Sequence, residues 1–201
     1  MSERERLIFA TGNAHKMTEI RAILGDRYDV VSMKEAGISA DIVEDGKTFE
    51  ANALIKARAV SKLAGCMAMA DDSGLEVDYL GGMPGIYSAR FLGEDTSYDI
   101  KNRVIIDMLQ KAAPSERTAR FVCAIACAWP DGREEVVRGV MEGEIAKEPA
   151  GPNGFGYDPI FFLPDKGMTS AELSPDAKNA ISHRGNALRL MRERLAEKER
   201  V

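Results

Sequence analysis

Two long segments rich in strand-forming residues flank the Asp131-Gly132 dipeptide, and they constrain the fold more than any other feature. The segment before the dipeptide is ARFVCAIACAWP, and the segment after it is REEVVRGVMEGEIA. Asp-Gly between two such segments is typical of a two-residue turn that joins antiparallel strands. Both segments are longer than an average strand. We therefore predict that this hairpin forms much of a central sheet.

The rest of the chain alternates between short apolar runs and helical patterns. These patterns predict strands at residues 6–10, 28–32, 66–70 and 75–80, helices that stop at Gly25 and Gly65, a helix over residues 96–113, and helices that begin near Ser174 and Ser182. The helix over 96–113 is predicted to have an apolar stripe of Ile100, Val104, Ile105, Met108 and Leu109. An antiparallel hairpin within such an alternation predicts an α/β fold with a mixed central sheet and flanking helices. The length of 201 residues suits a single domain over residues 1–201.

Charge and cysteine content exclude several classes of protein. The net charge is −5, whereas a general nucleic-acid binder carries a basic surplus that neutralises phosphates. No apolar run approaches the roughly 18 residues that a membrane-spanning helix requires, and the apolar run after MSERER is too short for a signal peptide. Three cysteines without a disulfide-scaffold spacing indicate a reducing compartment. We therefore expect a cytoplasmic protein that binds no nucleic acid and no membrane.

The segment TGNAHK, residues 11–16, follows the first predicted strand and opens the first predicted helix. Backbone N–H groups at a helix N-terminus attract anions such as phosphate. Gly12 would let the backbone approach an anion closely, Thr11 and Asn13 add side-chain donors, and Lys16 adds a positive charge. A plain helix cap is the alternative interpretation, since the pattern GxxxxGK[ST] is absent.

Two adjacent carboxylates, Asp71 and Asp72, follow the predicted strand over residues 66–70 and precede Ser73-Gly74. Two such groups are costly to place together without a cation or proton between them, and Mg²⁺ prefers carboxylate oxygen. An ionised Asp beside the metal would orient or deprotonate a water that attacks phosphorus. In an extended chain the two side chains point to opposite faces, so only one of them would face a given ligand. A solvated turn is the alternative.

Three further charged residues lie close to the alanine-rich helix that follows Thr48. Glu44 and Asp45 precede this helix and would either complete a metal site or interact with the helix dipole. Lys56 lies within the helix and would either face a phosphate or extend to solvent.

The segment GPNGFGYDP, residues 151–159, combines three glycines with two aromatic residues. This composition predicts a loop that approaches a flat ligand closely, with Phe155 or Tyr157 stacked on a base. A turn whose aromatic side chain packs into the core is the alternative. In AKNAISHRG, residues 177–185, the side chains of Lys178, His183 and Arg184 place donors near a helix start, which favours anions and base carbonyls.

Five motifs occur in one order along the chain: TGNAHK, EDGKTFEANALIKA, ADDSGLEVDYLGGMPGIYSARF, GPNGFGYDPIFF and KNAISHRGNAL. Together they resemble the inosine triphosphate pyrophosphatase family, over residues 7–195. The resemblance implies two lobes around an active-site cleft, a homodimer, and Mg²⁺-dependent hydrolysis of purine nucleoside triphosphates. The substrates would be the non-standard nucleotides ITP, dITP and XTP, cleaved to the monophosphate and pyrophosphate.

The resemblance also implies roles for individual residues. Asp72 matches the general base, and Glu44 and Asp72 match the metal ligands. The implied substrate contacts are Thr11, Gly12, Asn13, Lys16, Lys56, Ser73, Phe155, Gly156, Tyr157, Asp158, Lys178, His183 and Arg184. Donors that face O6 of a 6-oxo purine would discriminate against adenine. We hypothesise that backbone N–H groups of the glycine-rich loop, or His183 and Arg184, supply them.

Two alternative functions stay open at this point. A Maf-like nucleotide pyrophosphatase would act on other nucleotides and would ignore inosine triphosphate. A nucleotide-binding module without catalysis would not require Asp72 or Lys16, and both are present.

Overall fold

The computed structural model of the protein describes residues 4–198. The strands are β1 (Glu5–Phe9), β2 (Tyr28–Ser32), β3 (Ala68–Val77), β4 (Thr118–Ala128), β5 (Glu134–Ile145), β6 (Phe161–Leu163) and β7 (Met168–Thr169). The helices are α1 (Ala14–Leu24), α2 (Phe49–Ala64), α3 (Tyr98–Met108), α4 (Pro175–Ile181) and α5 (His183–Lys198). All seven strands belong to one sheet, in the order β2-β1-β3-β4-β5-β6-β7. β1 pairs in parallel with β2 and β3, whereas β6 pairs antiparallel with β5 and β7, so the predicted mixed sheet is confirmed.

β4 and β5 form the predicted hairpin. The N–H of Trp129 donates to the carbonyl of Arg133 at 3.0 Å, and at the other end the N–H of Ile145 donates to the carbonyl of Arg117 at 2.9 Å, which gives an antiparallel register. The turn spans residues 129–133 rather than two residues. Pro130 explains the difference, because proline has no N–H to donate and ends the ladder before Asp131 is reached.

β3 differs from the prediction in a way that matters for the site. The two predicted strands over residues 66–70 and 75–80 are one continuous strand, and residues 78–80 form a 3₁₀ turn instead. The interpretation of DDSG as a solvated turn is therefore wrong. Asp71 and Asp72 are 1% and 9% exposed, and a strand tolerates buried carboxylates when other elements supply their partners.

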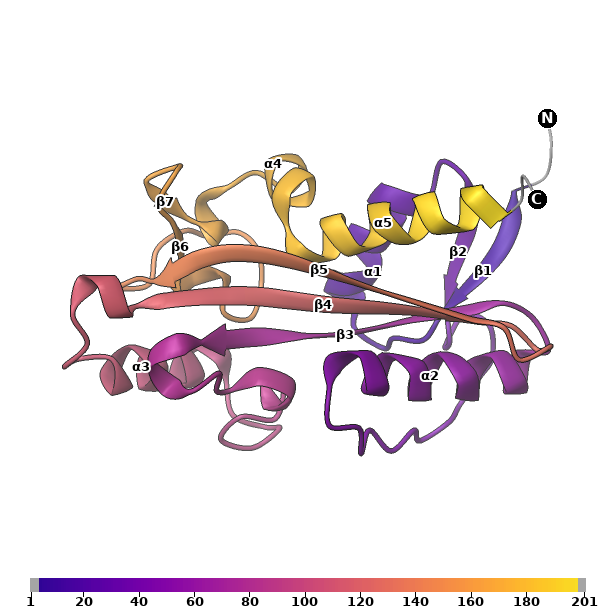
Figure 1. The fold of residues 1–201 in the computed structure, drawn as a ribbon, viewed down its shortest axis with the longest axis horizontal. Helices are drawn as coiled ribbons and strands as arrows, with labels where there is room; N and C mark the ends of the chain where they lie inside the picture. The colour runs from indigo at the N-terminus through magenta and orange to yellow at the C-terminus, as the bar shows by residue number, and fades with distance from the viewer. Residues whose placement is uncertain (1–3, 199–201) are drawn as a thin grey trace. The chain divides into compact units, whose positions relative to one another are not determined.

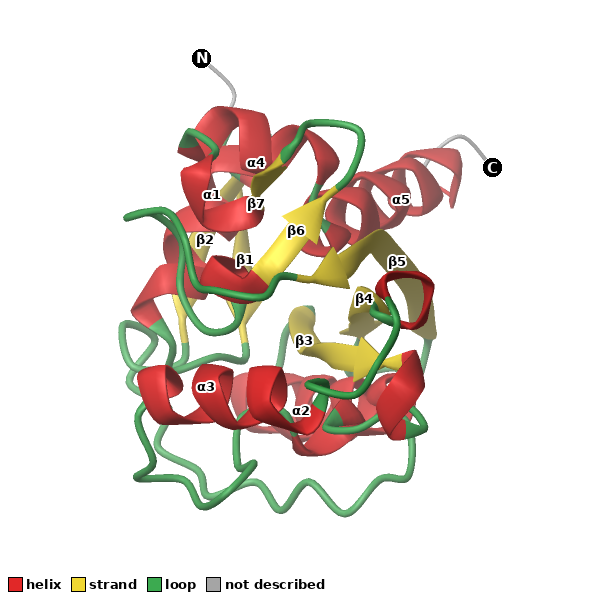
Figure 2. Cartoon of the chain, turned by 90° about the vertical axis from the view of Figure 1, so that its left-hand side faces the viewer, coloured by secondary structure: helices red, strands yellow, loops and turns green. Residues whose placement is uncertain are grey.

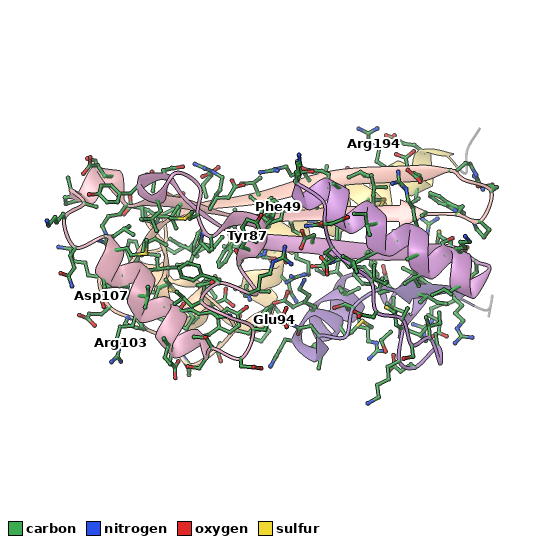
Figure 3. The ribbon with its side chains drawn as sticks, turned by 90° about the horizontal axis from the view of Figure 1, so that it is seen from below. Phe49, Tyr87, Glu94, Arg103, Asp107 and Arg194 are labelled. Atoms are coloured by element: carbon green, nitrogen blue, oxygen red, sulfur yellow. The ribbon has the colours of Figure 1, made fainter. Side chains whose placement is uncertain are left out.

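α3 is shorter than the predicted helix over residues 96–113. It begins after Ser97 and ends at Met108, where Leu109 leaves the helical conformation. Residues before a proline avoid the helical region, so Pro114 accounts for the extended conformation of Ala113 but not for the end of the helix at Met108. Arg103 and Asp107 lie on the exposed face of α3 and point outward (Figure 3).

The buried face of α3 is also rotated from the predicted stripe. Ile105 and Leu109 are fully buried as predicted, but Ile100 is 55% exposed. Lys101 and Asn102 are buried instead. Both of them find carbonyl partners outside α3, which the apolar pattern does not reveal.

The chain forms two compact units, and the first comprises Met1–Asp72, Cys123–Gly139 and His183–Val201. In this unit α1 and α5 pack against one another, and α2 lies on the other side of the strands (Figure 1). Thr48 caps α2 through a hydrogen bond from Ala51, and Gly65 ends the helix with a positive φ, as predicted. The core of this unit contains Leu7, Phe9, Met17, Ile20, Leu24, Leu188, Met191 and Leu195, together with Cys123 and Cys127.

The second unit comprises Ser73–Val122 and Val140–Ser182. In the view of Figure 2, α3 lies below β3 and the short strand β6 lies above it. Its core contains Leu75, Ile105, Leu109, Tyr157, Ile160 and Phe161. Within residues 4–198, no helix is long and apolar enough to cross a membrane. The active-site cleft and the single domain over residues 1–201 stay predictions.

Candidate active site

The loop between β1 and α1 acts as a helix cap. The Oδ1 atom of Asn13 accepts hydrogen bonds from the N–H groups of His15 at 2.9 Å and Lys16 at 3.2 Å. The hydroxyl of Thr11 accepts from the N–H of Asn13 at 3.2 Å. A Cβ atom added at Gly12 would meet nothing within 4 Å, so no neighbouring protein atom requires glycine here. The capping interpretation thus explains Asn13, while the exposed backbone at Gly12 has room for a ligand.

Asp71 is the centre of a buried ionic cluster. Its Oδ2 atom lies 2.8 Å from Nζ of Lys16 and 3.2 Å from Nη2 of Arg184. Arg184 also pairs with Glu19. Burial alone would raise the pKa of Asp71, but the charges of Lys16, Arg184 and Lys56 outweigh this effect and hold the pKa well below its usual range. Asp71 is therefore an ionised carboxylate that holds cations from α1 and α5 in place.

Asp72 belongs to a second set of contacts on the opposite face of β3. Nδ2 of Asn52 donates to Oδ2 of Asp72 at 3.0 Å. Nζ of Lys56 lies 2.8 Å from Oε2 of Glu44 and 3.9 Å from Oδ1 of Asp72. The side chain of Lys56 is only 13% exposed, so the interpretation that it extends to solvent is wrong. Burial raises the pKa of Asp72, and Lys56 and Asn52 offset only part of that effect.

The two adjacent aspartates therefore differ in chemistry as well as in direction. The strand sends their side chains to opposite faces, as the alternation rule predicts. The pKa of Asp71 is lowered and the pKa of Asp72 is raised. Environments that move the pKa values of two nearby carboxylates apart are how active sites give such groups different roles.

Glu44 and Asp72 have the donor chemistry of a magnesium site. Both carboxylates lie within 4 Å of the same lysine nitrogen, and carboxylate oxygen is the ligand that Mg²⁺ prefers. Within residues 4–198, no group of three or more His, Cys, Asp or Glu side chains could hold a metal. Mg²⁺ at phosphate sites is usually held by one or two carboxylates plus the substrate phosphates. The residues present fit such a shared site rather than a complete protein cage.

In the second unit, the glycine-rich loop is held by Asp158. This carboxylate is 2% exposed and accepts hydrogen bonds from Phe155 N at 2.8 Å and from the Ser170 hydroxyl at 2.9 Å. Nζ of Lys178 lies 2.6 Å from its Oδ2 atom. A Cβ at Gly154 would lie 2.4 Å from the same oxygen, so only glycine fits there. The loop is therefore built around a buried ion pair.

The two aromatic residues of this loop have different environments. Tyr157 is 4% exposed, and its hydroxyl donates to the carbonyl of Ser88 at 2.8 Å. Its ring meets the ring of Tyr98 edge to face, with centroids 5.2 Å apart. Phe155 is only half-buried, and Nζ of Lys178 lies 4.8 Å from its ring centroid. Tyr157 is thus the aromatic that packs into the core, and Phe155 is the better candidate for stacking on a base.

α3 supports the same loop from one side. Nδ2 of Asn102 donates to the carbonyl of Gly156 at 3.1 Å, and the ring of Tyr98 would lie 3.6 Å from a Cβ at Gly156. These contacts fix the backbone between Phe155 and Tyr157.

The remaining predicted residues fall in both units. His183 and Arg184 begin α5 in the first unit, where they are 6% and 1% exposed. Lys178 lies on α4 in the second unit, and Ser73 is a half-buried residue of β3. Their roles toward a substrate stay predictions.

The sequence interpretation missed Asn52 as a candidate site residue. A signal was available, because residues four apart on a helix share a face, and Asn52 lies four residues before Lys56. A polar side chain in an otherwise alanine-rich face beside a candidate lysine indicates a site. Asn102 carried no such signal, since its partner comes from a distant loop.

Comparisons with known proteins agree with the motif resemblance. The Ham1 family model matches residues 7–194. The dITP/XTP pyrophosphatase of Bacillus licheniformis is 48% identical over 187 residues, which cover 92% of this chain and 95% of that protein. The dITP/XTP pyrophosphatase of Escherichia coli O157:H7 is 45% identical over 194 residues, which cover 95% of this chain and 98% of that protein.

Solved structures agree with the fold. A HAM1 protein from Coxiella burnetii, 41% identical, superposes with a TM-score of 0.87 and covers 96% of this chain and 99% of its own. A dITP/XTP pyrophosphatase from Mycobacterium abscessus, also 41% identical, gives a TM-score of 0.75 and covers 92% of this chain and 98% of its own. With the family model matched over nearly the whole length, this chain belongs to the Ham1 family.

Proposed function

We propose that the protein is a hydrolase that converts the non-standard purine nucleotides ITP, dITP and XTP to the monophosphate and pyrophosphate. Relatives named dITP/XTP pyrophosphatase match over nine tenths of the chain or more and support this substrate class. The observation that carries the proposal is the buried Asp72 carboxylate, which lies beside Lys56 and Glu44. Such a group can accept a proton from a water that attacks phosphorus.

In this proposal the residues of the first unit carry the phosphate chemistry. Asp72 accepts the proton of the attacking water, and its raised pKa makes it a stronger base than an exposed aspartate. Lys56 places a positive charge beside Asp72, where charge develops on the reacting phosphates. Glu44 and Asp72 would hold Mg²⁺, which when bound would neutralise charge on the phosphates.

Base recognition is assigned to the loop around Phe155 and to His183. Two of the hypothesised O6 donors are committed elsewhere in the structure. The N–H of Phe155 donates to Asp158, and the guanidinium of Arg184 pairs with Asp71 and Glu19. We therefore propose that other N–H groups of the loop, or His183, meet O6 of the purine. Adenine would leave these donors unpaired.

Substitution of Phe155 tests the stacking role. Base–aromatic stacking contributes about 1–3 kcal/mol per base, so Phe155→Ala is expected to raise the KM for ITP by about tenfold. Phe155→Tyr keeps the ring face and should change KM by less than about threefold. Phe155→Leu separates stacking from apolar packing, and a normal KM in this variant would remove the stacking role. Steady-state kinetics of pyrophosphate release measures all three.

A pyrophosphate-release assay over a nucleotide panel tests the proposed function. We expect ITP, dITP and XTP to be cleaved at least tenfold faster than ATP and GTP, and chelation of Mg²⁺ to reduce the rate strongly. Cleavage of pyrimidine or modified nucleotides with ITP ignored would support the Maf-like alternative. Tight nucleotide binding without pyrophosphate release would support the non-catalytic module.

The homodimer and the cytoplasmic location also stay proposals. The homodimer comes from the family resemblance, and the large apolar side chains exposed on the second unit, among them Tyr79, Met83, Tyr87 and Ile100, are candidates for its interface. Sedimentation velocity checks the dimer, which would have twice the 22.0 kDa mass of the chain.

A further inference from the structure

We propose that Asn52 is a positioning residue that fixes the orientation of the Asp72 carboxylate, and this inference rests on the proposed role of Asp72 as the base. Asn52 lies on α2, is 1% exposed, and donates from Nδ2 to Oδ2 of Asp72 at 3.0 Å. Asn52 lies outside both the candidate phosphate loop, residues 11–16, and the candidate base loop, residues 151–159. Its effect on the reaction would therefore pass through Asp72.

The backbone of Asn52 is fixed, and the space beside its amide oxygen is limited. The first turn of α2 is fixed by its cap, where the N–H of Asn52 donates to the carbonyl of Thr48 at 3.1 Å. On the other side, a Cβ at Gly46 would lie 2.6 Å from Oδ1 of Asn52. Exchange of the amide oxygen and nitrogen would place an acceptor against the Asp72 carboxylate, which can only accept while it is ionised. The donor of Asn52 therefore has one direction, toward Asp72.

Stability alone does not explain an asparagine at this place. Oδ1 of Asn52 is buried and makes no hydrogen bond with any described residue. A buried amide oxygen without a partner destabilises the fold. Helix interiors also favour alanine or leucine over asparagine. The contact that accounts for the amide is the one to Asp72.

The hydrogen bond gives the two oxygens of Asp72 different environments. Oδ2 is held by the neutral donor of Asn52, whereas Oδ1 lies 3.9 Å from the ammonium of Lys56. With Oδ2 held, rotation of the carboxylate is restricted and Oδ1 keeps its direction. A carboxylate held in one direction is in the reactive orientation more often. Loss of this orientation should therefore lower kcat and leave KM nearly unchanged.

The test compares Asn52→Ala and Asn52→Asp in the full chain with ITP as substrate. Loss of a hydrogen bond to a charged group predicts that Asn52→Ala lowers kcat by about 10–100-fold while KM changes by less than about threefold. Asn52→Asp keeps the shape but puts a second carboxylate against Asp72, so its kcat should fall at least as far. If Asn52 only filled space, the isosteric Asp variant would be the milder one.

Ser61→Ala is the matched control. Ser61 lies on the same helix, is 2% exposed, and donates from its hydroxyl to the carbonyl of Cys66 at 2.8 Å. Its replacement removes a buried hydrogen bond of α2 that has no contact with Asp72. We expect a lower midpoint of thermal unfolding with kcat within twofold of the wild type. If Asn52→Asp does not fold, Asn52→Gln keeps an amide donor on a longer side chain and should lower kcat in the same direction.

Binding of a non-hydrolysable ITP analogue, measured by calorimetry, completes the test. An unchanged Kd with a reduced kcat in Asn52→Ala supports the positioning role. A kcat within twofold of the wild type, or a loss confined to KM and Kd, overturns it. An inactive wild type would overturn the proposed function itself, which separates that failure from the failure of this inference.

Discussion

Replacement of Asp72 by asparagine is expected to lower kcat by about a thousandfold and to change the affinity for substrate by less than about threefold. General-base catalysis by a positioned side chain contributes about 10²–10⁴ in rate, and asparagine cannot accept the proton of the attacking water. The variant keeps the shape of the side chain, so the contacts of Lys56 and Glu44 with each other remain possible. Single-turnover pyrophosphate release measures the rate, and calorimetry with a non-hydrolysable analogue measures the affinity.

The stability of this variant gives an independent check. Burial raises the pKa of Asp72, so its charged form is less favourable in the folded protein than in the unfolded chain. A neutral asparagine removes that penalty, and without divalent cations the variant should unfold at no lower urea concentration than the wild type. Asp29→Asn is the control for chemistry, because Asp29 is an exposed acid on β2 and its loss should leave kcat within about twofold. Turnover of Asp72→Asn within tenfold of the wild type would exclude Asp72 as the base.

The sequence predicted the elements of the fold more reliably than the packing of polar residues. The caps of α2 at Thr48 and Gly65 are local signals, and both are confirmed. The prediction of which face of α3 is buried was wrong, because Lys101 is buried. Its Nζ donates a hydrogen bond to the carbonyl of Ala89 at 2.6 Å. Ala89 lies in the loop before α3, and the periodicity of apolar residues does not predict the path of a loop. Local signals therefore fix where a helix begins, but tertiary partners decide which side is buried.

The same limit applies to the candidate site. The alternation of a strand predicted that Asp71 and Asp72 face opposite directions, and the structure agrees. The predicted end of the strand at residue 70 was wrong, because β3 continues through Asp71. A buried Asp71 is tolerated there because cations from α1 and α5 pair with it. Composition likewise could not predict which of Phe155 and Tyr157 packs into the core. Tyr157 does so because its hydroxyl donates to the carbonyl of Ser88, a residue distant in the sequence.

Replacement of Asp71 by asparagine is expected to lower the free energy of unfolding by about 3 kcal/mol. Removal of one partner from a buried ion pair costs about 3–5 kcal/mol, because the remaining charge is left uncompensated. The lower end applies here, since Lys16 is 18% exposed and Arg184 keeps its contact with Glu19. Urea unfolding at pH 7 without divalent cations measures the effect. A variant as stable as the wild type would show that Asp71 does not hold these two cations.

The pH dependence of this effect has a definite sign. The pKa of Asp71 is lower in the folded protein than in the unfolded chain, so the carboxylate stabilises the fold at every pH above its unfolded value. That contribution is lost as the pH falls through the folded pKa, and the difference between Asp71→Asn and the wild type should then shrink. The pKa of Asp72, the next residue of β3, is raised instead. The wild-type protein should therefore be no more stable than the Asp72→Asn variant at neutral pH. Opposite outcomes for two adjacent aspartates would separate the residue that maintains the fold from the residue that performs the chemistry.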